Sequence, residues 1–98
     1  MESFLFTLPA TIKIRRQAHV GVVGSGDLEI ILEPNDQAVA EITIRTGVTG
    51  HQASWEAVIQ RFFKQHDLAA KVKINDFGAT PGMVAVRLAQ AMEVCCYD

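Results

Sequence analysis

The chain has 98 residues, of which 49% are hydrophobic and 20% are charged, and its formal net charge is -2. This composition predicts a single packed domain over residues 1–98 and argues against intrinsic disorder. Nucleic-acid binding is not expected, because it needs a basic stripe and the only adjacent basic pair is Arg15-Arg16.

No stretch approaches the roughly 20 apolar residues that cross a bilayer. The start of the chain, Met1-Glu2-Ser3-Phe4, lacks the features of a signal peptide. We therefore expect no membrane span and a cytoplasmic location. The adjacent Cys95 and Cys96 would close no useful loop, so we expect reduced thiols in a loose tail.

The first half of the chain has the period of two that is typical of strands. A short apolar run ends at Pro9, and alternating patterns follow it up to Arg45. The expected strands are Ser3–Leu8, Ala18–Gly24, Leu28–Glu33 and Ala38–Arg45. A turn signal, Pro34-Asn35-Asp36, separates the third from the fourth.

The second half changes to a helical period. Apolar residues recur at i, i+3, i+4, i+7 and i+8 from Trp55 to Phe63, with Thr49 and Gln52 as a capping box and Asp67 just past the end. A strand over Ala70–Asn75 follows. Thr80-Pro81 then begins a second helix, in which Val84, Leu88 and Ala91, flanked by Ala85 and Met92, form a narrow apolar stripe.

The order of four strands, a helix, a strand and a helix predicts an α+β domain. Two helices are expected to pack on a mostly antiparallel sheet. Neither repeats nor linkers interrupt the chain.

The residues suggest no catalytic machinery. His19, His51 and His66 lie far apart, and none has a partner at metal-ligand spacing. The two cysteines do not form a Cys-x-x-Cys pair. The glutamates of the strands are expected to face solvent rather than to converge in a pocket.

The one local constellation of interest is Gly24-Ser25-Gly26-Asp27, between the second and third strands. Glycines, serine and aspartate suit a tight turn between antiparallel strands, so Ser25 is expected at a loop tip. A plain turn role explains the serine on physical grounds. A hydroxyl between two glycines is also open to a modifying enzyme and to a bulky phosphodiester, and nearby N–H groups could hold a phosphate.

The segment Gly24-Ser25-Gly26-Asp27-Leu28-Glu29 resembles the acyl carrier (delta) subunit of malonate decarboxylase. The later segment Asp76-Phe77-Gly78-Ala79-Thr80-Pro81, which leads into an Ala-rich helix with Arg87, is similar to the second shared segment of that family. The likeness in length and order spans essentially the whole chain.

This resemblance implies a carrier without catalysis of its own. Ser25 would bear 2'-(5''-phosphoribosyl)-3'-dephospho-CoA through a phosphodiester, with Gly24 and Gly26 shaping the loop, and the thiol would hold acetyl or malonyl as a thioester. The implied partners are an acetyl/malonyl transferase subunit, the decarboxylase subunits, a prosthetic-group transferase and a malonyl transferase. Asp27 and Asp76 would position the arm or the modifying enzyme, although roles in a turn and in capping a loop are the simpler explanations.

Two alternatives stay open from the residues. The carrier subunit of citrate lyase uses the same prosthetic group and has a similar Asp-x-Gly-Ala segment. A small α+β protein-interaction domain without a prosthetic group would also fit the pattern.

Overall fold

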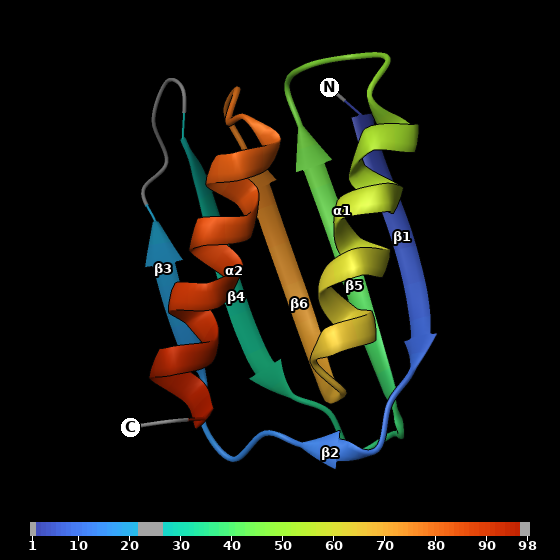
Figure 1. The fold of residues 1–98 in the computed structure, drawn as a ribbon, viewed down its shortest axis with the longest axis vertical. Coiled ribbons are helices and arrows are strands. Elements are labelled where there is room, and N and C mark those ends of the chain that lie inside the picture. Colours follow the sequence, from blue (N-terminus) through green and yellow to red (C-terminus); the bar gives the residue numbers. More distant parts are fainter. Residues whose placement is uncertain (1, 22–26, 97–98) are drawn as a thin grey trace.

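Two helices cover one face of a single sheet, as Figure 1 shows. The computed structural model describes residues 2–21 and 27–96. Its elements are β1 (Glu2–Pro9), β2 (Ile12–Lys13), β3 (Ala18–Gly21), β4 (Leu28–Pro34), β5 (Val39–Thr46), α1 (Gln52–Gln65), β6 (Leu68–Asp76) and α2 (Pro81–Cys96). The predicted α+β class is confirmed.

The sheet runs in the order β1-β5-β6-β4-β3. The pairs β1–β5, β6–β4 and β4–β3 are antiparallel, whereas β5 and β6 are parallel. A parallel pair needs a crossover connection, and α1 supplies it between β5 and β6. The two-residue β2, which was not predicted, adds to the start of β6 in parallel.

The core lies between the helices and the facing side of the sheet. The alternation predicted for the strands is confirmed, since Ile30, Ile42 and Ile74 are fully or almost fully buried while Lys71 and Lys73 are exposed. From the helices, the predicted apolar stripes supply Trp55, Ile59, Phe63, Val84, Leu88, Ala91 and Met92. Ala85, which flanks the second stripe, is exposed.

The helix ends correct one prediction and confirm another. Helix α1 has His51 at its N-cap with no side-chain hydrogen bond there, so the capping box from Thr49 is wrong. His66 is the C-cap, and Asp67 follows the helix as predicted. At α2, the Met83 N–H donates to Thr80 Oγ1 at 3.2 Å, which confirms Thr80 as the cap.

The end of the chain differs from the loose tail that was predicted. Cys95 lies within α2, is buried, and is disulfide-bonded, so the prediction of a reduced thiol in a tail is wrong for this residue. Among the described residues, neither helix has the length and apolar character needed to cross a membrane. The cytoplasmic location stays a prediction.

Candidate functional site

The predicted attachment loop connects β3 to β4. Gly24, Ser25 and Gly26 lie outside the described residues. The strands on either side pair antiparallel, with Gly21 opposite Glu29 and Ala18 opposite Leu32. The predicted connection between adjacent antiparallel strands is therefore confirmed, and the described flanks show how its base is held.

Gly21 closes the base on the β3 side. It has a φ of 84°, and a Cβ built on it would lie 2.0 Å from the carbonyl oxygen of Leu28. Only glycine tolerates both this backbone conformation and so close an approach of another main chain. The two strands thus come together tightly just before the connection.

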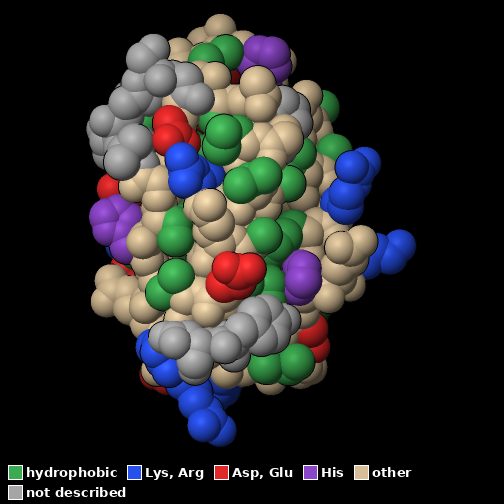
Figure 2. All heavy atoms as spheres, turned by 60° about the vertical axis from the view of Figure 1, so that its left-hand side comes forward, with side chains coloured by type: hydrophobic (Ala, Val, Ile, Leu, Met, Phe, Trp, Pro, Cys, Tyr) green, Lys and Arg blue, Asp and Glu red, His purple; other side chains and the backbone are tan. Residues whose placement is uncertain are grey.

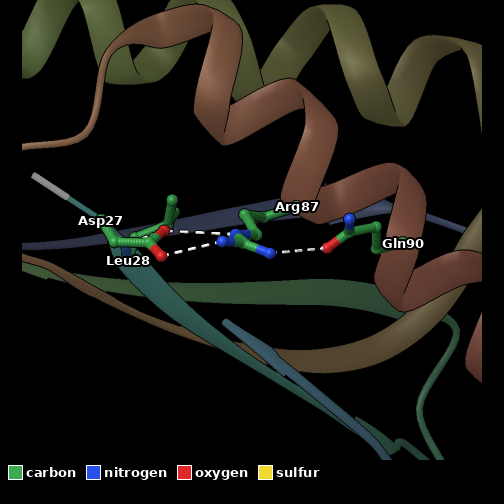
Figure 3. A network of polar contacts seen from close by, with 4 residues as sticks. All are labelled: Asp27, Leu28, Arg87 and Gln90. Carbon is green, nitrogen blue, oxygen red and sulfur yellow. Dashed lines mark hydrogen bonds and ion pairs between the residues drawn. The ribbon is translucent and has the colours of Figure 1, made fainter. Parts of the chain in front are cut away.

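Asp27 closes the base on the β4 side through an ion pair with α2. Arg87 Nε donates to Asp27 Oδ1 at 3.2 Å and Arg87 Nη2 donates to Oδ2 at 2.8 Å, a two-pronged contact shown in Figure 3. The Leu28 N–H also donates to Oδ1 at 2.7 Å. The Arg87 hydrogen bond first, and then the Leu28 N–H, lower the pKa of Asp27 below its ordinary value.

Arg87 is itself oriented by its own helix. Its Nη1 donates to Gln90 Oε1 at 2.9 Å, one turn further along α2 (Figure 3). The side chains of Arg87 and Asp27 are only 24% and 18% exposed. A partly buried, bidentate pair of this kind has a defined geometry, unlike most surface pairs.

The β6–α2 connection supports the same base. The Phe77 N–H donates to the carbonyl oxygen of Asp27 at 2.9 Å. Next to it, Asp76 accepts the Ala79 N–H at 2.9 Å and the hydroxyl of Thr46 at 2.8 Å. Asp76 therefore caps the loop as predicted, and it also ties that loop to the end of β5.

The sequence predicts a turn role for Asp27, but the local pattern does not indicate that Arg87 is its partner. The turn contact exists, because Asp27 accepts the N–H of the next residue. The ion pair joins the segment around Ser25 to the segment from Asp76 to Arg87. Both segments resemble the same family, and this resemblance is the feature of the sequence that relates one segment to the other.

A cavity opens at the same edge of the sheet. It has a volume of about 320 Å³ and lies between the first turns of α1, the β5–α1 connection and the β6–α2 connection. Its lining residues are Val48, His51, Ser54, Trp55, Val58, Asp76, Gly78, Ala79 and Val84. In Figure 1 the start of β4 and these two connections lie toward the upper edge, and β3 points toward the same edge.

A second hollow lies at the opposite end, beside β2. Its volume is about 550 Å³, and Lys13, Arg15, Arg16 and His66 contribute to its walls together with Asp67. Figure 2 shows Lys and Arg side chains gathered at this lower end. Thr11 donates to Asp67 through both its N–H and its hydroxyl, which lowers the pKa of that carboxyl.

The histidines occupy separate environments. His19 Nε2 lies 2.8 Å from Glu29 Oε2 on the strands, and the His66 ring lies 4.5 Å from that of Phe62. Hydrogen bonds from Asn75 and then His19 lower the pKa of Glu29. Within residues 2–21 and 27–96, no group of three or more His, Cys, Asp or Glu side chains could hold a metal ion.

The fold and the site define a small two-layer α+β domain that holds a serine-bearing hairpin at one edge of its sheet. The family model of the malonate decarboxylase delta subunit (MdcD) matches residues 8–95. The chain is 42% identical to the malonate decarboxylase acyl carrier protein of Stutzerimonas stutzeri (strain A1501), with both chains covered completely. It is 45% identical to that of Azotobacter vinelandii, with 95% of each chain covered.

The fold has a close counterpart as well. A chain in the crystal structure of a Pseudomonas malonate decarboxylase hetero-tetramer in complex with malonate superposes with a TM-score of 0.91 and 42% identity, covering 96% of this chain and 98% of that one. The chain therefore belongs to the family of malonate decarboxylase delta subunits, the acyl carrier proteins of that enzyme. It is a carrier and not a catalytic subunit.

Proposed function

We propose that this chain is a single carrier domain over residues 1–98 that bears its cargo on Ser25. The attached group would be 2'-(5''-phosphoribosyl)-3'-dephospho-CoA, joined to the serine hydroxyl through a phosphodiester. Its terminal thiol supplies the thioester on which acetyl and malonyl are carried. Gly24 and Gly26 leave room around the hydroxyl for so large a substituent.

The observation that carries this proposal is the anchoring of the hairpin base. Gly21, Asp27 and the Phe77 N–H fix both flanks of the connection against β4, α2 and the β6–α2 loop. In the sequence Ser25 follows Gly21 by four residues and precedes Asp27 by two, so the connection that contains it is anchored on both sides. The attached arm would supply the reach. The residues that are described thus fit a tethered group.

Covalent attachment of the acyl group also accounts for a carrier that has no catalytic groups and acts through partner subunits. Covalent attachment raises the effective concentration of the acyl group at successive active sites. The chain then needs no acid, base or nucleophile of its own. We propose that its partners are an acetyl/malonyl transferase subunit, the decarboxylase subunits, and the prosthetic-group and malonyl transferases that load it.

Of the alternatives, the family match favours malonate decarboxylase over citrate lyase, because the matched model covers residues 8–95. The match also favours a carrier over a plain interaction domain. The cytoplasmic location predicted from the sequence is consistent with a substrate carried as a thioester, and it belongs to the same proposal.

Intact mass of the protein purified from its native host tests the proposal. The expected result is an added mass equal to the phosphoribosyl-dephospho-CoA unit, absent in Ser25→Ala and retained in Ser3→Ala. Ser3 is an exposed serine on β1, so its substitution controls for the loss of a surface hydroxyl. A native protein with no added mass would overturn the proposal.

A further inference from the structure

The cavity at the upper edge is separate from the ion pair that anchors the hairpin, because neither Asp27 nor Arg87 lines it. Its walls are mainly apolar, with side chains from Val48, Trp55, Val58, Ala79 and Val84. The polar side chains in the wall are those of His51 and Ser54, which are exposed, and one buried carboxylate, Asp76. Its volume of about 320 Å³ falls at the lower end of the range of about 300–1,000 Å³ that is usual for small-molecule sites. The cavity therefore suits a small and largely apolar group.

The cavity adjoins the base of the hairpin that bears Ser25. Asp27, two residues after Ser25, accepts a hydrogen bond from Phe77 at 2.9 Å, and the next residue, Gly78, is part of the cavity wall. Asp76 also lies in the wall and stands opposite Leu28 in the sheet register. The β6–α2 loop thus contacts the base of the hairpin on one side and the cavity on the other.

We propose that this cavity shelters the acetyl thioester at the end of the arm; this inference rests on the proposed function above. An acetyl thioester has no charge, and an apolar wall stabilises it by removing it from water. Attack by water or by other nucleophiles needs access to the thioester carbonyl, so the sheltered form reacts more slowly.

The same cavity disfavours the malonyl form. Malonyl carries a free carboxylate, and its burial beside the Asp76 side chain would cost desolvation and like-charge repulsion. Both oxygens of Asp76 are already engaged, one by the Ala79 N–H and one by the Thr46 hydroxyl. The cavity therefore retains acetyl and leaves malonyl outside, where a partner subunit can take it.

The single tryptophan of the chain makes the inference measurable, because Trp55 lines the cavity. The holo-carrier is prepared in its thiol, acetyl and malonyl forms, and intact mass confirms each form. Trp55 emission and its quenching by acrylamide are recorded, together with the rate at which hydroxylamine cleaves each thioester. Acetyl-CoA and malonyl-CoA free in solution give the reference rates.

In the acetyl form, Trp55 is expected to be shielded from acrylamide. Its thioester is expected to react with hydroxylamine about three- to tenfold more slowly than acetyl-CoA, because only the fraction of molecules with the arm outside the cavity reacts. The malonyl form is expected to react like malonyl-CoA. Val48→Phe, which fills the mouth of the cavity from an exposed position, should abolish the difference. Val86→Phe makes the same change at an exposed valine of α2 outside the cavity and should behave like the wild type.

Failure of the proposed function and failure of this inference give different results. A native protein without the arm overturns the proposed function and, with it, this inference. A loaded arm whose acetyl thioester reacts at the same rate in the wild type and in Val48→Phe overturns the inference alone. Ser54→Leu narrows the same cavity from the exposed side of α1, and agreement of both filling variants excludes a local folding defect as the cause.

Discussion

The guanidinium of Arg87 lies 2.8 Å from the carboxylate of Asp27, although the two residues are 60 positions apart in the chain. The pair joins α2 to the first residue described after the Ser25 loop (Figure 3). Around it, the Leu28 N–H donates to the Asp27 side chain and the Phe77 N–H donates to its carbonyl oxygen. The ion pair and the Phe77 hydrogen bond thus hold together three segments at the edge where β3 connects to β4.

Removal of the cation is expected to loosen this edge. In Arg87→Met, the amide protons of Leu28 and Phe77 should exchange with solvent faster, because Asp27 is no longer fixed between them. Hydrogen exchange followed by NMR measures this directly. The amide of Ala10, which bonds to Ala38 at the other end of the sheet, serves as the internal control and should not change. Unchanged exchange at Leu28 and Phe77 would show that the pair does not hold the edge.

The pair also predicts the direction of a pH dependence. The pKa of Asp27 is lowered in the folded state from 3.8. The stability that the pair contributes is therefore fully present above that value, and it is lost as the pH falls through the lower folded pKa. The free energy of unfolding, measured with urea, should be higher for the wild type than for Arg87→Met at pH 7. This difference should shrink below about pH 3.8.

The control for this titration is Lys73→Met. It removes the 3.6 Å pair with Glu33, in which the side chains are 59% and 37% exposed. An exposed pair of this kind contributes little, so the variant should stay close to the wild type across the range. A stability difference for Arg87→Met that persists unchanged into acid would contradict the assignment of the effect to Asp27.

Replacement of Gly21 by alanine is expected to destabilise the protein, and replacement of Gly50 is a matched control. Gly21→Ala should cost more than the roughly 1–3 kcal/mol of backbone strain at positive φ, because its Cβ would also meet the Leu28 carbonyl oxygen at 2.0 Å. Gly50→Ala has the same strain, with a φ of 82°, and meets nothing within 4 Å. Urea unfolding should therefore rank Gly21→Ala well below Gly50→Ala; equal losses would mean that the close approach is not a constraint.

Loss of the buried hydrogen bond between Thr46 and Asp76 is expected to lower the free energy of unfolding. In Thr46→Val, one carboxylate oxygen of Asp76 loses its donor in a buried setting, which should cost about 1–3 kcal/mol. Thr43→Val changes the same residue type three positions earlier, on the other face of β5, and should cost much less. Chemical denaturation of both variants measures the difference, and a comparable loss in the two would count against the role of Asp76.

The two threonines considered as helix caps give opposite expectations. Thr80→Ala should destabilise the protein by about 0.5–2 kcal/mol, because it removes the acceptor of the Met83 N–H. Thr49→Ala should have almost no effect, since His51 is the N-cap of α1 and no side-chain hydrogen bond caps that end of the helix. Thermal unfolding distinguishes them, and a loss in Thr49→Ala as large as that in Thr80→Ala would restore the capping box.

Local patterns were enough for much of the fold. Alternation predicted the buried faces of β4, β5 and β6, and the helical period predicted which side of α1 and α2 packs on the sheet. These patterns work because one buried face fixes the register of a strand or helix. The two-residue β2 has too little pattern to be predicted, and the parallel pairing of β5 with β6 depends on where α1 crosses.

The sequence by itself determined that a serine stands between two glycines, between two strands, in a chain that resembles a carrier. Only the tertiary structure decided what holds that connection, because Gly21, Asp27, Phe77 and Arg87 come from three separate segments. The cavity at the same edge is likewise made by α1, α2 and two connections. Periodicity reports which residues face inward, whereas contacts between distant segments arise only when the elements pack.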